Sequence, residues 1–193
     1  MQKITLGRSG LVVPRNGFGA LPIQRISQAE AVNLVRRALD GGMYYFDTAR
    51  FYTDSEEKLG VALEGRRSEV VISTKTGATT VEGFWSDLET SLTLLRTDYV
   101  DLYQFHNPAF CPKPGDGSGL YEAMQEAVRQ GKVRHIGITN HTRVNSENST
   151  TNICHYCLIR MDSSNTSIIT LLPVIKVRGA HLTGAPLLPL LQA

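Results

Sequence analysis

The sequence predicts an α/β protein whose fold is an incomplete (β/α)8 barrel with an N-terminal β-hairpin and about five βα units. Strand-like apolar segments alternate with segments of helical period from residue 1 to about residue 140. Polar residues at the ends of successive strands are evenly spaced, with 28 positions from Asp47 to Lys75, 31 from there to His106 and 34 to Asn140. One βα unit takes about 30 residues and a whole barrel at least about 200, so the 193 residues are too few for eight units.

Apolar spacing and turn residues place the elements of these units. Capping pairs predict three helix starts, at Ser27 with Glu30, at Asp54 with Glu57 and at Thr79 with Glu82. These helices are expected to end at Gly41-Gly42, near Gly65 and near Leu95, and a fourth is expected over 119–129. The expected strands are a hairpin of 3–6 and 11–14, followed by 16–20, 43–49, 70–76, 100–106 and 135–140.

Composition narrows the class of partner. The net charge is +2 and the Lys and Arg residues are scattered, so the sequence predicts neither a nucleic-acid partner nor binding to an anionic membrane. No run reaches the roughly 18–20 apolar residues that span a bilayer, and the first residues lack the pattern of an export signal. We therefore expect a cytoplasmic protein, whose 41% hydrophobic residues are enough to bury a core.

The cysteine pattern predicts no metal site. The chain has three cysteines, Cys111, Cys154 and Cys157, of which the last two form a lone Cys-x-x-Cys. A structural zinc takes about four ligands, and no second pair exists. A redox-active pair needs thioredoxin-like surroundings, which the neighbouring sequence does not offer.

The chain changes character after about residue 144. Only five charged residues occur from 145 to 193, and apart from a strand expected within 167–177 the segment shows no capped amphipathic element. We interpret 1–144 as a partial barrel and 145–193 as an atypical tail, for which a shift of reading frame near 143–146 is one hypothesis. A partial barrel has open sheet edges, so we expect the tail to cover one edge or a second copy of the chain to pair with it.

Three strand ends and one loop carry residues suited to acid–base chemistry. Asp47 ends the second barrel strand, Lys75 the third and His106 the fourth, while Tyr52 follows shortly after Asp47. Each residue alone has an ordinary structural explanation, as a cap, a packing ring or a satisfied buried histidine, but a lysine that closes a buried strand needs a partner. Barrel active sites form at the C-terminal ends of several strands. Together the four residues predict one catalytic site.

Five sequence motifs resemble those of the aldo-keto reductase family, in the family's order and at barrel spacing. They are the opening Leu6-Gly7-Arg8-Ser9-Gly10-Leu11 to Gly17-Phe18-Gly19-Ala20, the segment Asp47–Glu56 followed by Leu59-Gly60, Ser73-Thr74-Lys75, Leu102–His106 and Gly131–Asn140. The resemblance covers about residues 1–143. One such motif is a weak signal, whereas five in order are specific.

The resemblance implies reduction of an aldehyde or ketone to an alcohol with NADPH or NADH. In such a site Tyr52 would donate the proton and Lys75 would lower the pKa of that phenol. Asp47 would hold Lys75 in place, and His106 would orient the carbonyl group of a small substrate. The residues implied in cofactor binding are Gly19, Ala20, Asp47, Thr139 and Asn140.

The missing length leaves other functions open. Family members continue well beyond the fifth barrel strand, and their last units supply loops that hold the phosphates and adenine of the cofactor. We therefore expect weak or no turnover by this chain, and the alternative is a non-catalytic remnant or an interaction module that uses its exposed edges. A lyase that forms a Schiff base on Lys75 is a second enzymatic alternative. The substrate and the choice between NADPH and NADH depend on loops without a counterpart after residue 144.

Overall fold

The structure is a computed structural model that describes residues 2–6, 9–139, 159–160 and 168–171. The strands of this part are β1 (Lys3–Thr5), β2 (Val12–Pro14), β3 (Asn16–Gly19), β4 (Tyr45–Asp47), β5 (Val71–Thr76), β6 (Val100–His106), β7 (Val133–Thr139), β8 (Ile159–Arg160) and β9 (Ile168–Leu171). Its helices are α1 (Gln28–Asp40), α2 (Ser55–Ala62), α3 (Val81–Leu94) and α4 (Leu120–Arg129), with short 3-10 helices η1 (Leu21–Arg25) and η2 (Arg67–Glu69).

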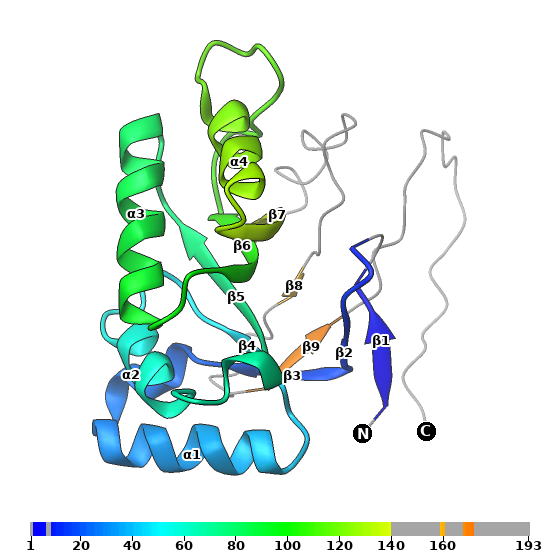
Figure 1. Ribbon diagram of the computed structural model, residues 1–193, viewed down its shortest axis with the longest axis vertical. Coiled ribbons are helices and arrows are strands. Elements are labelled where there is room, and N and C mark those ends of the chain that lie inside the picture. The colour runs from blue at the N-terminus through cyan, green and yellow to red at the C-terminus, as the bar shows by residue number, and fades with distance from the viewer. Residues whose placement is uncertain (1, 7–8, 140–158, 161–167, 172–193) are drawn as a thin grey trace, which may run out of the picture.

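Strands β3 to β7 form the parallel sheet of an α/β barrel. They lie in chain order across the sheet, and each pairs in parallel with the next. The helices connect successive strands, and Figure 1 shows them along one side of the sheet with the β1–β2 hairpin on the other. The predicted fold class, parallel βα units with an N-terminal hairpin, is confirmed.

The first barrel strand has a second neighbour that comes from the tail. β9 pairs antiparallel with β3, so that Asn16 lies opposite Thr170 and Phe18 opposite Ile168, and β8 pairs with β9. β9 falls within 167–177, the range expected to form a strand. The tail therefore covers this edge of the sheet, which is one of the two expected outcomes. Pairing with a second copy of the chain stays a prediction, as does the division of the chain at residue 144. Most of the tail, including Cys154 and Cys157, lies outside the described residues.

Alternation along the strands divides the apolar side chains between two clusters. Outward-facing residues such as Phe46, Ile72 and Phe105 pack against the helices in the larger cluster. Inward-facing residues such as Tyr45 and Leu102 pack against the β1–β2 hairpin in the smaller one. The hairpin thus closes the N-terminal end of the barrel interior, and the polar inward-facing residues lie toward the other end of the strands.

One of the three predicted helix caps forms as expected. Ser27 accepts a hydrogen bond from the amide of Glu30, whose carboxylate reaches back to the Ser27 amide, so this capping box is confirmed. Asp54 precedes α2 without capping it, because its backbone is not extended and its carboxylate pairs with Lys58 at 2.8 Å. The cap of α3 is Thr80 and not Thr79, since the Thr80 hydroxyl accepts from the first-turn amide.

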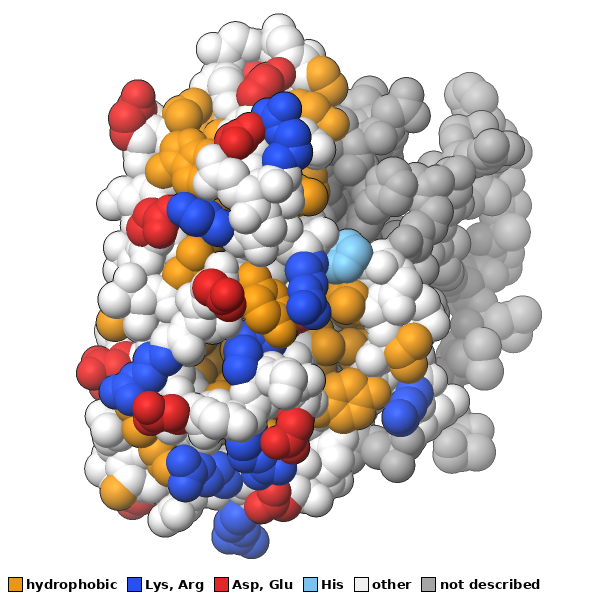
Figure 2. All heavy atoms as spheres, in the orientation of Figure 1, with side chains coloured by type: hydrophobic (Ala, Val, Ile, Leu, Met, Phe, Trp, Pro, Cys, Tyr) orange, Lys and Arg blue, Asp and Glu red, His pale blue; other side chains and the backbone are white. Residues whose placement is uncertain are grey.

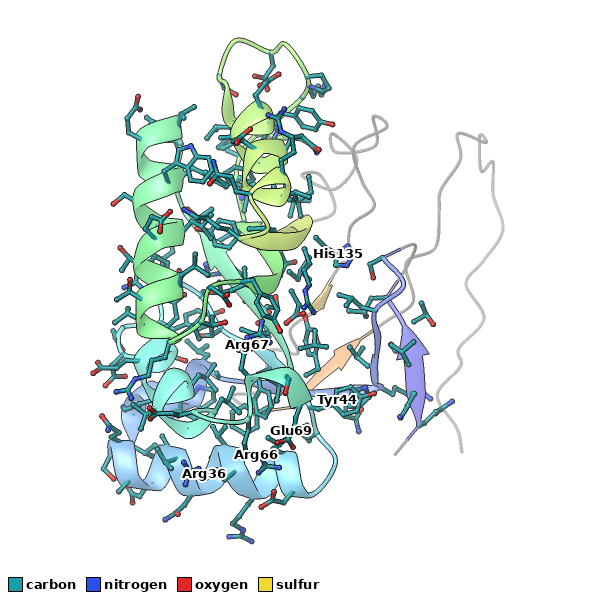
Figure 3. All side chains as sticks on the ribbon, in the orientation of Figure 1. Arg36, Tyr44, Arg66, Arg67, Glu69 and His135 are labelled. Atoms are coloured by element: carbon teal, nitrogen blue, oxygen red, sulfur yellow. The ribbon has the colours of Figure 1, made fainter. Side chains whose placement is uncertain are left out.

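A buried charge cluster joins the N-terminal ends of β5, β6 and β7. Asp101, 1% exposed, accepts hydrogen bonds from Arg67 at 2.8 Å, from Arg134 at 2.9 Å and from the backbone amide of Ile72 at 2.9 Å. The guanidinium carbons of both arginines lie over the Tyr99 ring, 3.9 and 4.0 Å from its centroid. Figure 3 labels Arg67, which comes from η2 and reaches this end of the sheet. Both oxygens of the buried carboxylate are therefore satisfied, and three strands are tied together at their beginnings.

The surface carries charges of both signs. On the face drawn in Figure 2, Lys and Arg side chains alternate with Asp and Glu. An example of such mixing is Arg66, which pairs with Asp40 at 2.7 Å and with Glu69 at 2.9 Å. Among the described residues, none of the helices combines the length and apolar character that crossing a membrane requires.

Candidate active site

The carboxyl ends of β4, β5 and β6 bring three of the predicted residues to one edge of the sheet. Asp47 is the last residue of β4, Lys75 the last but one of β5 and His106 the last of β6. Asp47 pairs with Ser73 and Lys75 with Gln104 in the parallel register. Because paired residues share a face and so do residues two apart, all three side chains belong to the inner face of the barrel.

Lys75 and Asp47 form a buried ion pair. The Lys75 Nζ lies 2.5 Å from Oδ2 of Asp47 and 2.6 Å from the carbonyl oxygen of Thr48. The two side chains are 2% and 1% exposed. Removing two charges from water costs several kcal/mol per ion before their attraction offsets it, so a buried pair at strand ends is more typical of an active site than of a stabilising contact.

Tyr52 joins this pair to His106. Its ring centroid lies 5.2 Å from the Lys75 Nζ and 5.6 Å from the His106 ring, which it meets edge-on at 83°. The Tyr52 side chain is 7% exposed. Backbone hydrogen bonds from its amide to Ala49 and to its carbonyl from Ser55 hold the loop that carries it. The structure thus brings all four predicted catalytic residues together.

The electrostatic surroundings of Tyr52 differ from the expectation that Lys75 lowers its pKa. Burial raises the pKa of the Tyr52 phenol above its ordinary value, and the negative charge of Asp47 raises it further. The ammonium of Lys75 is already bound by two oxygen atoms and faces the ring. Both effects favour the protonated phenol, and they also make it a weaker acid than an ordinary tyrosine.

Backbone strain marks two positions of the site. Thr53, directly after Tyr52, has φ 39°, and Asn107, directly after His106, has φ 49°. Non-glycine residues seldom adopt positive φ, and each such residue costs about 1–3 kcal/mol unless its surroundings hold it there. The backbone directly after Tyr52 and directly after His106 is therefore held in a constrained conformation.

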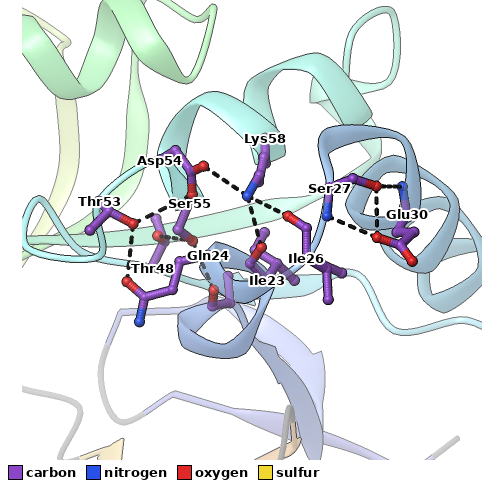
Figure 4. Close-up of polar contacts among 11 residues, drawn as sticks. Ile23, Gln24, Ile26, Ser27, Glu30, Thr48, Thr53, Asp54, Ser55 and Lys58 are labelled. Atoms are coloured by element: carbon purple, nitrogen blue, oxygen red, sulfur yellow. Dashed lines mark hydrogen bonds and ion pairs between the residues drawn. The ribbon is translucent and has the colours of Figure 1, made fainter.

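A polar network behind the site fixes the beginning of α2, as Figure 4 shows. Lys58, 5% exposed, donates to the carbonyl oxygens of Ile23 at 3.0 Å and Ile26 at 2.7 Å. Ser55 lies 2.9 Å from the Thr48 hydroxyl and donates to the carbonyl of the residue after β3. The network joins η1, the end of β4 and α2, and so positions the loop that carries Tyr52.

Two of the predicted cofactor residues lie directly beside Asp47. Gly19 is its partner in the β3–β4 register, and the amide of Ala20 donates to the Asp47 carbonyl at 2.8 Å. Ala20 is fully buried and its carbonyl accepts from Ser55. The second carboxylate oxygen of Asp47, Oδ1, is buried and accepts no hydrogen bond from the described residues. An acceptor of this kind fits a hydroxyl donor such as a ribose of NADPH or NADH presents.

Thr139, the fourth predicted cofactor residue, ends β7 opposite His106. Its hydroxyl accepts from the amide of Asn107 at 3.0 Å and donates to the Phe105 carbonyl at 3.3 Å, which joins the ends of β6 and β7. Asn140, predicted to act with it, lies outside the described residues. Within the described part of the chain no three His, Cys, Asp or Glu side chains gather as metal ligands would.

Sequence reasoning missed several residues that shape the site. Gln104, fully buried on the inner face, donates to Ser73 at 2.7 Å, and Phe51 stacks on His106 with ring centroids 5.7 Å apart. Lys58 belongs to the same group. A glutamine or lysine among apolar residues is a signal that a buried partner exists, although the sequence does not say which partner.

A family model for the aldo/keto reductase family matches residues 15–152, a range that holds the whole of this site and more than half of the chain. The chain belongs to the aldo/keto reductase family. The match begins after the hairpin and continues past residue 144, where the partial barrel is predicted to end.

Three aldo/keto reductase relatives give the extent of the likeness. The chain is 30% identical over 207 residues to L-galactose dehydrogenase of Arabidopsis thaliana, an alignment that covers 93% of this chain and 63% of that protein. It is 38% identical over 128 residues to an aldo-keto reductase of Mycobacterium avium, over 63% of this chain and 43% of that protein. The solved aldo/keto reductase of Klebsiella pneumoniae in complex with NADP and acetate has a TM-score of 0.65 and 28% identity, over 76% of this chain and 52% of that one. This chain therefore spans less than two-thirds of the length of each.

Proposed function

We propose that this chain carries the catalytic site of an oxidoreductase that reduces an aldehyde or ketone to an alcohol with NADPH or NADH. The observation that carries the proposal is the continuous contact of Asp47, Lys75, Tyr52 and His106, from the 2.5 Å ion pair to the 5.6 Å ring contact. A proton donor and a hydrogen-bond donor beside a buried charge pair are what an oxygen that gains negative charge requires. Membership of the aldo/keto reductase family supports the same chemistry.

The protein's own groups supply the proton and hold the substrate. The Tyr52 hydroxyl, kept protonated by its raised pKa, donates its proton to the substrate's carbonyl oxygen as charge develops there. The imidazole of His106, half-buried beside the phenol ring, donates a hydrogen bond to the same oxygen and fixes its position. The ammonium of Lys75 lies beside the Tyr52 ring, and Asp47 and the carbonyl oxygen of Thr48 hold it there.

NADPH or NADH, when bound, supplies the hydride that adds to the carbonyl carbon. The second oxygen of Asp47 and the neighbouring ends of β3 and β7 are the groups we assign to holding it. The complex of the Klebsiella pneumoniae relative with NADP supports NADP(H) as the first cofactor to test.

The test is NADPH consumption by the purified chain with a small aldehyde, compared between the unmodified chain, Tyr52→Phe and Tyr121→Phe. We expect slow turnover that Tyr52→Phe lowers at least about 100-fold, because a general acid contributes that much or more. Tyr121→Phe, the same change on α4 at a tyrosine outside the four catalytic candidates, is expected to leave turnover unchanged. NADPH binding, followed by nicotinamide fluorescence, is expected for all three proteins.

Two outcomes overturn the proposal. Turnover that survives Tyr52→Phe removes the proton donor from the mechanism, and an absence of both binding and turnover favours the non-catalytic alternative. A Schiff base on Lys75 is disfavoured because its ammonium is buried and bound by two oxygens. Borohydride with a carbonyl substrate is expected to leave the mass of the chain unchanged.

A further inference from the structure

Phe51 is the most exposed large apolar side chain of the described residues, at 64%, and it directly precedes Tyr52 of the candidate active site. An exposed phenylalanine gains little from burial, so its own packing does not account for its position. Its ring stacks on His106, with centroids 5.7 Å apart and planes at 27°. This separation and tilt lie within the range of favourable offset stacking.

The ring of Phe51 packs directly against the backbone of a glycine. A Cβ atom placed on Gly77 would lie 2.0 Å from Cζ and 2.4 Å from Cε2 of Phe51, closer than real atoms approach. Gly77 directly follows β5, two residues after Lys75. Only a residue without a side chain therefore lets the Phe51 ring rest against the end of β5 and reach His106 at the end of β6.

His106 is thus bounded by two rings from consecutive residues of one loop. Phe51 stacks on its face at 27°, and Tyr52 meets it edge-on at 83°. A histidine side chain has two rotatable bonds, and neighbours in these two directions restrict both the place and the plane of the imidazole. The direction of the imidazole N–H then depends on Phe51 as well as on the backbone of β6.

We propose that Phe51, seated on Gly77, is a positioning residue that fixes the plane of His106 toward the carbonyl oxygen of the substrate. The inference rests on the proposed reductase function for its catalytic consequence, but its geometric part concerns the chain alone. It predicts an effect on kcat, because a misaligned hydrogen-bond donor loses transition-state stabilisation. A side chain that merely lined the substrate site would raise KM and leave kcat unchanged.

The geometric part is tested by NMR on the full chain without cofactor. The ring protons of His106, assigned by comparison with His106→Gln, are expected to change their nuclear Overhauser contacts to the Tyr52 ring in Phe51→Ala and to keep them in Phe51→Tyr. Leu34→Ala on α1, another exposed apolar side chain at 40%, is the matched control and leaves these contacts in place. Unchanged contacts between the His106 and Tyr52 rings in Phe51→Ala overturn the inference, whether or not the chain turns over substrate.

The catalytic part is tested by a double-mutant cycle on turnover. Phe51→Ala is expected to lower kcat about tenfold, since small misplacements in a site cost up to about 100-fold, and Phe51→Tyr retains most of it. Gly77→Ala displaces the ring and lowers kcat in the unmodified background, but adds nothing to Phe51→Ala, because both changes remove one interaction. A cost of Gly77→Ala that persists in Phe51→Ala, or a rise in KM alone, overturns the inference. An inactive unmodified chain refutes the proposed function instead, and the NMR result then decides on Phe51.

Discussion

Two buried aspartates at opposite ends of the same sheet show how this fold separates stability from chemistry. Asp101 lies near the beginning of β6 and Asp47 at the end of β4, and each is 1% exposed. Both oxygens of Asp101 accept hydrogen bonds, from two arginines and a backbone amide. Asp47 has Lys75 on one oxygen, and the other accepts no hydrogen bond from the described residues. A saturated carboxylate suits a structural role, and one with free acceptor capacity suits ligand binding.

The basic partners of the two carboxylates differ in their exposure to solvent. The side chains of Arg67 and Arg134 are 17% and 53% exposed, so solvent screens their charges. Lys75 is 2% exposed and held by protein oxygens, in surroundings where charges act more strongly. In barrels generally, residues at the N-terminal face of the sheet contribute to stability, and residues at the C-terminal face carry the chemistry.

The largest expected effect comes from removing the charge of Asp47. Asp47→Asn keeps the shape of the side chain but removes the carboxylate that binds Lys75, so the ammonium is no longer held beside the Tyr52 ring. We expect turnover to fall at least about 100-fold, the contribution typical of the acid–base machinery. The measurement is steady-state NADPH consumption, with circular dichroism to show that the fold is retained.

The matched control for Asp47→Asn is the same substitution at the other buried aspartate. Asp101→Asn, the same change at the other end of the sheet, is expected to leave turnover per folded molecule within about twofold, because it touches no group of the site. If both substitutions lower turnover equally in fully folded protein, the division between the two ends of the sheet is wrong.

The second effect is on stability and belongs to Asp101. Breaking a buried ion pair costs about 3–5 kcal/mol, and we expect about 2–3 kcal/mol for Asp101→Asn because Arg134 can turn to water. The measurement is urea unfolding followed by circular dichroism. The control is Asp40→Asn, which removes the exposed partner of Arg66 and is expected to cost less than about 1 kcal/mol. Equal losses of unfolding free energy in the two variants would show that the burial of Asp101 does not strengthen its ion pairs.

The sequence predicts the sheet and the site residues well where the relevant information is local. The strand over 100–106 and the Ser27 capping box match because apolar runs and caps depend on near neighbours. The cap at Asp54 fails because Lys58, four residues on, takes its carboxylate. Asp47, Lys75 and His106 come together because parallel strands end at one edge, a rule that needs only strand positions.

Contacts between distant segments could not be predicted in the same way. Lys58 binds carbonyl groups 35 and 32 positions away, at Ile23 and Ile26, and nothing near it in the sequence names these partners. The sequence likewise does not reveal which side chains bind the carboxylates of Asp101 and Asp47. Their difference lies in residues some 30 positions away, Lys75 for one and Arg67 and Arg134 for the other.

The smallest effect is a pH dependence at the Asp101 end of the sheet. Burial lowers the pKa of His135, on β7, below its ordinary value, while Asp101 raises it and Arg134 lowers it; Figure 3 labels this histidine. The folded state therefore binds the His135 proton less readily than the unfolded chain. The resulting stability is present above the unfolded pKa near 6.5 and is lost as the pH falls through the folded pKa. His135→Gln is expected to reduce the loss of unfolding free energy on the acid side.

The opposing charges allow a sharper measurement of the same group. In an NMR titration, Asp101→Asn is expected to lower the pKa of His135 further, because the raising charge is gone, and Arg134→Gln is expected to raise it, because the lowering charge is gone. Asp47→Asn, at the other end of the sheet, leaves the titration unchanged. Shifts of the same sign in Asp101→Asn and Arg134→Gln would mean that the cluster acts on His135 through a change of structure. If instead the pKa of His135 shifts in opposite directions in these two variants and does not change in Asp47→Asn, the two ends of the sheet are electrostatically independent. Substitutions can then change the stability of the barrel without changing its chemistry.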